Sequence, residues 1–290
     1  MKRLFYCDHH EIPLPAGHRF PMRKYRMVRD LLAGGAFEFV EAPLADPRVI
    51  ALAHAPLYVE AFLRGSLDAA AMRRIGFPWS EGLVRRTLAS VGGTLAAAGE
   101  ALANGWGGTL AGGTHHAFPD YGAGFCVFND FAVAIASLRL RAAVIDLDVH
   151  QGDGTAAFFE RDPEVFTLSL HGAANFPFRK QRSTLDAGLA DGAGDAIYLA
   201  ALEAALPRVE AFAPRIVFYQ SGVDGLAEDA LGRLQLTQAG LKQRDELVFE
   251  TIRRLGVPAV ITMGGGYARP IERTAEAHAQ TFTLAAALLR

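Results

Sequence analysis

Short, continuous apolar runs alternate with longer segments of helical periodicity along this chain. The apolar runs lie at residues 4–7, 39–42, 107–113, 144–148, 165–170, 215–220 and 259–263. Helical periodicity covers residues 22–32, 49–63, 83–103, 129–140, 154–160, 195–212, 237–255 and the C-terminal segment. Apolar strands that alternate with helices are typical of a parallel sheet buried on both faces. The pattern predicts a single-domain α/β protein over residues 1–290, with an open, mostly parallel sheet and helices on both faces.

Polar side chains follow several of these predicted strands directly. They include the pair His115-His116 and, further along the chain, Asp224 and Tyr267. Ligands of open α/β sheets bind outside the carboxyl ends of the strands. We therefore expect these distant segments to converge on one site. Residues 173–195 are expected to form a long loop, and a loop of that length in a compact domain is usually functional or mobile.

The strand that begins at Val144 leads into the strongest chemical signal. Side chains alternate faces along a strand, so Asp146, Asp148 and His150 point the same way. Two carboxylates and an imidazole on one side of a strand end call for a cation. Asp148, His150 and Asp224 would supply three protein ligands and leave a position for water, as catalytic zinc sites do. An oxygen-rich set of this kind also accepts Fe²⁺, Co²⁺ or Mn²⁺.

His115 and His116 are the candidates for general base and general acid beside such a metal. Asp146 and Asp153 are carboxylates that would fix the imidazole tautomer and raise its basicity. Tyr267, after a run of three glycines, either donates its hydroxyl to a developing oxyanion or packs beside a turn.

Aromatic side chains near glycines suggest the shape of the substrate channel. Phe125 beside Gly124, together with Phe176, would wall an apolar slot for an alkyl chain. Simple core packing is the alternative for each of them.

Composition narrows the classes of function. The chain has 290 residues, of which 51% are hydrophobic and 21% charged, and this suits a globular protein with a large core. A formal net charge of −2 gives no electrostatic case for binding nucleic acid or a membrane. No apolar stretch is long enough to span a bilayer. The two cysteines, Cys7 and Cys126, form neither a disulfide framework nor a CxxC motif, which favours a cytoplasmic location.

Taken together, the motifs resemble the zinc-dependent histone deacetylase family. Its motifs appear in order at residues 112–116 (Gly-Gly-Thr-His-His), 124–126 (Gly-Phe-Cys), 146–154, 169–171 (Ser-Leu-His), 221–226 and 264–267 (Gly-Gly-Gly-Tyr). Residues 17–22, 231–234 and 244–249, with Gln151 where many relatives have a second histidine, are most similar to the class IV branch and its bacterial relatives.

The resemblance implies an arginase/deacetylase-type fold and a role for each matched residue. Zinc is implied on Asp148, His150 and Asp224. Catalytic roles are implied for His115, His116, Asp146, Asp153 and Tyr267, with His116 as the preferred base and acid. The tunnel for the acyl-lysine substrate is implied at Gly124, Phe125 and Phe176. A potassium ion is implied at Asp146, Asp148, His150, Ser169 and Leu170, and a second one near Phe159, Asp162 and Val165.

The favoured function is hydrolysis of N-acyl-lysine side chains of proteins or peptides, with an acetyl or a longer fatty acyl group. One alternative is deacetylation of small N-acyl amines such as acetylpolyamines, and a wider acidic mouth would favour it. The chain has no clear match to the rim aspartate that grips the peptide backbone in many relatives. A catalytically silent module that binds a metal or a partner is a further alternative. A two-manganese ureohydrolase is disfavoured, because the sequence offers one compact set of three ligands.

Overall fold

One parallel sheet of eight strands organises the computed structural model, which describes residues 1–289. The strand order is β2-β1-β3-β8-β7-β4-β5-β6, and every neighbouring pair is parallel. The strands are β1 (Lys2–Tyr6), β2 (Phe37–Glu41), β3 (Trp106–Thr109), β4 (Ala142–Asp146), β5 (Val165–Gly172), β6 (Leu185–Leu189), β7 (Ile216–Gln220) and β8 (Ala259–Thr262). The predicted α/β architecture with a parallel sheet is confirmed.

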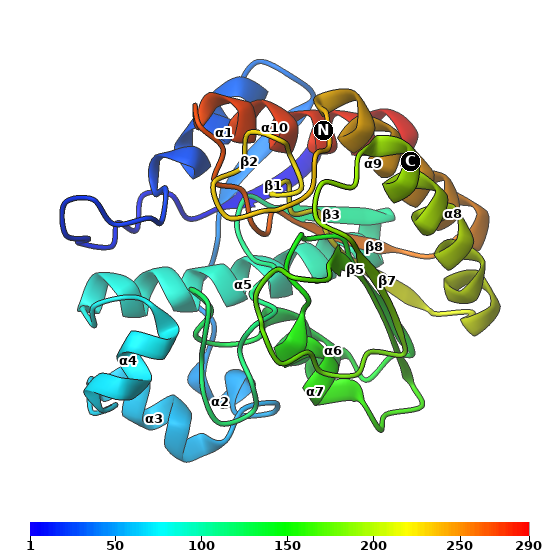
Figure 1. Ribbon diagram of the computed structural model, residues 1–290. Helices are drawn as coiled ribbons and strands as arrows, with labels where there is room; N and C mark the ends of the chain where they lie inside the picture. The colour runs from blue at the N-terminus through cyan, green and yellow to red at the C-terminus, as the bar shows by residue number, and fades with distance from the viewer. Residues whose placement is uncertain (290) are drawn as a thin grey trace.

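Helices cover both faces of the sheet (Figure 1). One face carries α1 (Arg23–Leu32), α8 (Asp195–Phe212), α9 (Gln238–Leu255) and α10 (Glu272–Leu288). The other face carries α5 (Glu81–Asn104), α6 (Asp130–Leu138) and α7 (Asp153–Phe159), and α2 (Pro47–Ile50), α3 (Pro56–Arg64) and α4 (Ala69–Ile75) lie beyond α5. None of the described helices combines the length and apolarity needed to cross a bilayer.

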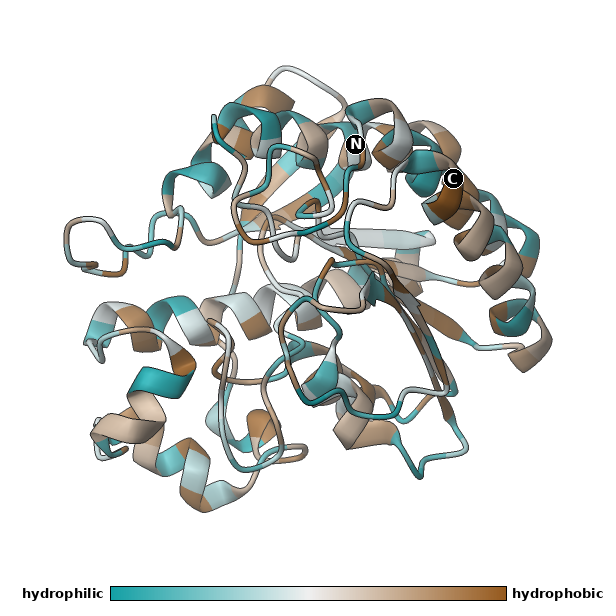
Figure 2. Ribbon diagram, viewed as in Figure 1, coloured by the Kyte–Doolittle hydropathy of each residue, from teal (hydrophilic) through white to brown (hydrophobic). Residues whose placement is uncertain are grey.

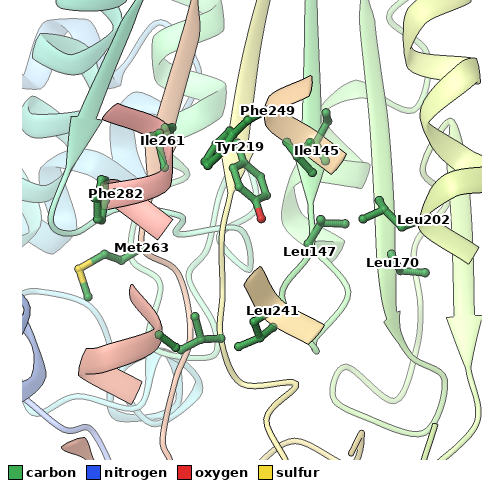
Figure 3. Close-up of a cluster of buried hydrophobic side chains, with 14 of the residues drawn as sticks. Ile145, Leu147, Leu170, Leu202, Tyr219, Leu241, Phe249, Ile261, Met263 and Phe282 are labelled. Atoms are coloured by element: carbon green, nitrogen blue, oxygen red, sulfur yellow. The ribbon is translucent and has the colours of Figure 1, made fainter. Parts of the chain in front are cut away.

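The central strands send alternate side chains into two separate cores. Ile145, Tyr219 and Ile261 point to the face covered by α9 and α10, where they pack with Phe249 and Phe282 (Figure 3). Their neighbours along the same strands, among them Val144, Phe218 and Val260, pack on the opposite face. Figure 2 shows the resulting pattern, with hydrophobic central strands and hydrophilic stretches on the outer helices. Burial on both faces explains why these strands are apolar up to their last residues, which are polar.

Two expectations from the sequence are wrong in detail. The helix expected at residues 49–63 is split into α2 and α3, and Pro56 begins the second of them. Proline lacks the backbone N–H of a helix interior, so it is tolerated at a helix start. The loop expected at residues 173–195 contains the edge strand β6, which alternates half-buried and exposed residues. An edge strand with one exposed side lacks the continuous apolar run that reveals a central strand.

The four strands in the middle of the sheet end at the same level. The register pairs Thr109 with Thr262, Thr262 with Gln220, and Gln220 with Asp146. The loops after β3, β8, β7 and β4 therefore leave the same edge of the sheet side by side. These are the segments that carry the polar residues singled out in the sequence.

Candidate metal-dependent active site

A cavity at the carboxyl edge of the sheet brings the predicted residues together. Those that line it are His115, His116, Gly124, Phe125, Asp148, His150, Asp224 and Tyr267. Asp146, Asp153 and Phe176 contact members of this group from outside the lining. Of the residues predicted for potassium, Asp148 and His150 line this cavity and the others do not.

Asp148, His150 and Asp224 form a compact cluster of possible metal ligands. The Nδ1 atom of His150 lies 3.0 Å from Oδ1 of Asp148 and 3.0 Å from Oδ2 of Asp224. Both carboxylates are fully buried, and the ligand atoms of all three residues lie within 4.8 Å of one another. Tetrahedral zinc with bonds of about 2.0 Å separates its ligand atoms by roughly 3.3 Å. The three side chains therefore fit a zinc ion between them.

Each of the two carboxylates has one oxygen held by the protein and the other directed at His150. Oδ2 of Asp148 accepts hydrogen bonds from the Gly265 backbone N–H at 2.8 Å and from the Gln220 amide at 2.9 Å. Oδ1 of Asp224 accepts a hydrogen bond from the Val149 backbone N–H at 2.8 Å. The remaining oxygens, Oδ1 of Asp148 and Oδ2 of Asp224, therefore both face the His150 ring, and Oδ1 of Asp148 also accepts the His150 backbone N–H at 3.0 Å.

The electrostatics of the cluster also call for a cation. Burial and the neighbouring Asp148 carboxylate raise the pKa of Asp224 to about 7. Burial would lower the pKa of His150, but hydrogen bonds to Asp148 and Asp224 outweigh it and raise that pKa to about 10. Two buried like charges are costly without compensation, and a divalent ion supplies it.

His115 and His116 are each backed by a different carboxylate. Nδ1 of His115 lies 2.7 Å from Oδ2 of Asp146, and Nδ1 of His116 lies 2.6 Å from Oδ1 of Asp153. With the Nδ1 proton donated to the carboxylate, Nε2 is a free acceptor when the ring is neutral and a donor when the ring is charged.

The two imidazoles differ in charge. Burial would lower the pKa of His115, but the carboxylates of Asp146 and Asp148 outweigh it and raise that pKa to about 9. Burial, together with the adjacent His115 ring, lowers the pKa of His116 to about 4. His116 is thus the neutral member of the pair and the one able to accept a proton.

Tyr267 stands on the loop after β8, and its ring lines the cavity. Its backbone N–H donates to the Asp229 carboxylate at 2.6 Å, which holds the backbone of the loop at this residue. Burial raises the pKa of Tyr267 well above its ordinary value, so the hydroxyl keeps its proton. A neutral phenol in this position is a hydrogen-bond donor.

The glycines before Tyr267 are held from behind by two buried side chains. The Lys24 ammonium donates to the carbonyls of Gly264 at 3.1 Å and Gly266 at 3.3 Å, and Nε2 of His278 lies 3.1 Å from the Gly265 carbonyl. A Cβ on Gly265 would collide with Asp224 and would lie 2.6 Å from Oδ2 of Asp148. Position 265 therefore needs glycine because the backbone passes directly against both carboxylates.

Two aromatic contacts and a glycine define the mouth of the cavity. Phe176 packs edge-on against His116, with ring centres 4.9 Å apart. Phe125 packs against Tyr267 at 6.2 Å. A Cβ added to Gly124 would lie 2.7 Å from the His116 ring and 3.2 Å from Phe176. Position 124 therefore has room for a glycine but not for a side chain.

Sequence reasoning missed several residues that hold the site. The Gln220 amide donates to Asp148, and its carbonyl oxygen accepts a hydrogen bond from the Gly222 backbone N–H at 2.7 Å. The fully buried carboxylate of Asp130 accepts hydrogen bonds from the backbone of Gly113 at 2.9 Å and Thr114 at 2.8 Å, just before the histidine pair. Gln220 ends an apolar strand, and this was the available signal. Asp130 looked like an ordinary first-turn helix residue.

The residues predicted for potassium fall in two places. Asp146 pairs with Ser169 across β4 and β5, so these two residues lie side by side. Phe159, Asp162 and Val165 line a hollow at the α7–β5 turn, away from the main cavity. Both potassium sites stay predictions.

His9, His10 and Glu41 form a second group of possible ligands away from this cavity, with ligand atoms within 4.8 Å of one another. Nε2 of His9 lies 2.9 Å from a carboxylate oxygen of Glu41.

Comparison with known proteins gives concordant matches. The family model of the histone deacetylase domain matches residues 18–283. An uncharacterized protein of the cyanobacterium Picosynechococcus is 45% identical over 279 residues, 92% of each chain. Histone deacetylase 2 of Arabidopsis thaliana is 36% identical over 63% of this chain and 50% of its own length. The histone deacetylase-like amidohydrolase of Pseudomonas aeruginosa is 34% identical over 53% of this chain and 45% of its own length. The matched regions thus span about half of these two named relatives.

Solved structures agree with the fold. The HD domain of HDA15 superposes with a TM-score of 0.81 at 22% identity, covering 100% of this chain and 91% of that one. A histone deacetylase homologue complexed with SAHA superposes with a TM-score of 0.80 at 26% identity, covering 97% and 84%.

Proposed function

The chain belongs to the histone deacetylase family, and we propose that it is a zinc-dependent amidohydrolase that removes acyl groups from N-acyl-lysine side chains. The observation that carries this is the convergence of the Asp148–His150–Asp224 cluster, a neutral His116 and the Tyr267 ring on one cavity. We infer that residues 1–290 act as one catalytic domain, since the family match covers residues 18–283.

Asp148, His150 and Asp224 would hold the metal. A bound zinc ion supplies Lewis acidity, which activates water and polarises an amide carbonyl. Fe²⁺, Co²⁺ or Mn²⁺ would suit the same oxygen-rich set. Potassium near Asp146 and Ser169 would add positive charge behind the cluster.

His116 performs the proton transfers in this proposal. Its Nε2 takes a proton from the attacking water, while Nδ1 stays hydrogen-bonded to Asp153, which stabilises the imidazolium. The same nitrogen then protonates the leaving lysine amine as the C–N bond breaks. His115, held by Asp146, keeps its positive charge and stabilises negative charge that develops beside it. Positioned acid–base help of this kind contributes ~10²–10⁴ in rate.

Tyr267 donates its hydroxyl to the oxyanion that forms when the carbonyl is attacked. One such donor contributes about 10²–10³ in rate. Phe125 and Phe176 flank the aliphatic stem of the lysine and exclude water from the reacting centre.

The mouth of the cavity favours acyl-lysine peptides over acylpolyamines. The loop at residues 175–182 presents Phe178, which is 87% exposed, followed by Arg179 and Lys180. The Lys180 ammonium donates to the carbonyls of Asn175 and Pro177, both at 2.6 Å, and holds the loop in place. An aromatic and basic rim repels a polycation and offers contact area to a peptide chain. A cytoplasmic location would suit two buried, unpaired cysteines.

The test is turnover of acyl-lysine peptides, from acetyl to long fatty acyl, by the zinc-loaded protein and by Tyr267→Phe. The proposal predicts turnover that falls about 10²–10³-fold in the variant, and Tyr121→Phe, a tyrosine stacked on Phe118, serves as a control. Activity confined to free acylated amines would transfer the assignment to small N-acyl amines. No turnover on either class, with zinc bound, would support a silent metal-binding module.

A further inference from the structure

The cavity extends beyond the metal cluster toward helix α5. It passes the loop at residues 111–114 and reaches a region that we call the α5 lobe, lined by Ile12, Tyr25, Leu83, Arg86, Thr87 and Val91. The loop and helix are in contact, because the Gly112 backbone N–H donates to the Ser90 hydroxyl at 3.2 Å. The cavity offers about 140 Å³ to a water-sized sphere, several times the roughly 10–15 Å³ that one water needs by that measure.

Arg86 is an unusual lining residue for such a lobe. It is 5% exposed, and its guanidinium donates a hydrogen bond to the Cys7 carbonyl at 2.6 Å. The guanidinium carbon lies 4.2 Å from the ring centre of Tyr25. Within residues 1–289, no carboxylate oxygen forms an ion pair with it. The nearby Asp8 carboxylate pairs with Arg29 at 2.8 Å instead.

Among residues 1–289, the other buried arginine has the charged partner that burial normally requires. Arg244 is paired with the adjacent Asp245 at 2.8 Å and also donates to backbone carbonyls. Arginine is rarely buried without a partner, because removing its charge from water is costly. A guanidinium that opens onto a cavity and has donors to spare is suited to bind a carboxylate with two parallel hydrogen bonds.

Apolar walls with one buried cation specify a ligand that is an alkyl chain ending in a carboxylate. We propose that the α5 lobe selects dicarboxylic acyl groups, such as succinyl, glutaryl or adipoyl, and that Arg86 binds their terminal carboxylate. This rests on the proposed deacylase function. Hydrolysis then adds water across the amide, breaks the C–N bond, and yields the free lysine amine and a dicarboxylic acid. A plain fatty acyl chain of the same length would place a methyl group against Arg86 and leave the cation without water or a counter-ion.

The same guanidinium could bind the carboxylate of any released acid, so the experiment must separate acyl group from product. The zinc-loaded enzyme is assayed on peptides with acyl groups paired by carbon number: butyryl with succinyl, valeryl with glutaryl, and hexanoyl with adipoyl. The quantity compared is the ratio of kcat/KM for the two members of a pair, which cancels any difference in the amount of folded enzyme. Inhibition of acetyl-lysine hydrolysis by free butyrate and free glutarate is measured in parallel.

At least one dicarboxylic acyl group is expected to exceed its partner, and Arg86→Gln is expected to lower that ratio about ten- to a hundredfold, the range for hydrogen bonds to charged groups. Arg86→Lys keeps the charge and should restore part of the ratio. Arg85→Gln is the matched control, because Arg85 is exposed and pairs with Glu81 at 3.5 Å. Its ratio should equal that of the wild type.

Ratios at or below one for all pairs, unchanged by Arg86→Gln, would overturn the inference. Hydrolysis of acetyl and butyryl peptides in the same assay would still support the deacylase function. Inhibition by butyrate that weakens in Arg86→Gln, without a preference for dicarboxylic acyl groups, would also overturn it in favour of a product-acid site. No hydrolysis of any acyl peptide would overturn both proposals.

Discussion

Gln220 offers a way to weaken the metal site without changing a ligand. Its amide donates to Oδ2 of Asp148 at 2.9 Å, and its carbonyl accepts from the Gly222 backbone at 2.7 Å. Gln220→Met keeps a similar volume and removes both hydrogen bonds. Asp148 would then keep one of the two donors on that oxygen, the Gly265 N–H. Loss of a hydrogen bond to a charged group costs about 1.5–3 kcal/mol, and changes of this kind lower metal affinity about 10–100-fold.

The assay is competition for zinc against a chromophoric chelator, with the melting temperature measured on the same samples. Gln220→Met also leaves the Gly222 N–H buried without an acceptor, which costs a further ~1–3 kcal/mol of stability. Tyr219→Phe is the matched control. It lies next in the same strand, points to the opposite face, and removes a buried hydrogen bond to Asp245. A zinc Kd for Gln220→Met within about twofold of the wild type, or an equal change in Tyr219→Phe, would refute this account of how Asp148 is held.

Other perturbations separate the remaining roles. Gly265→Ala should abolish zinc binding in the same chelator assay, because the added Cβ would occupy the space of the Asp148 and Asp224 oxygens; retained stoichiometric zinc would contradict this. His116→Ala should lower kcat by about 10²–10⁴ with unchanged zinc content, and an equal loss of bound zinc would instead make His116 a ligand. Asp245→Asn should destabilise the protein by about 3–5 kcal/mol in urea unfolding, because it leaves Arg244 charged and buried without its partner; a loss below about 1 kcal/mol would show that the backbone carbonyls suffice.

The parts of the fold that the sequence predicted share one physical property. β4, β7 and β8 are buried on both faces, so every residue except the last one of each strand is hydrophobic and the run was visible. The edge strand β6 has an exposed side and includes Asp186 and Gly188, and it was therefore hidden among loop residues. The split between α2 and α3 depended on Pro56, whose effect on the backbone overrode an apolar pattern that continued through it.

The candidate site was predictable where its chemistry sits in local motifs. Asp148 and His150 stand two residues apart just after β4, which ends at Asp146, and the alternation of side chains in an extended chain predicts that both point the same way. Their supports were not predictable in this way. The partner of Gln220 is 72 positions away in the chain, and those of Lys24 are 240 and 242 positions away. Asp130 binds backbone groups 16 and 17 positions away. The fold brings these groups together. An amide at a strand end has many uses, and the sequence alone does not distinguish among them.

Charge along the cavity connects the proposed reaction with the proposed selectivity. The two ligand carboxylates carry a formal charge of −2, which a divalent ion cancels, so the loaded centre is close to neutral. The charged side chain that remains in the α5 lobe is the cation Arg86, and the rim contributes Arg179 and Lys180. Hydrolysis of an amide converts a neutral acyl group into a carboxylate close to these positively charged side chains. A cavity that is neutral at the metal and cationic beyond it therefore favours anionic acyl groups on entry and stabilises the acid that the reaction forms. Arg86→Gln tests both consequences, because the acyl ratio and the inhibition by free acids depend on the same guanidinium.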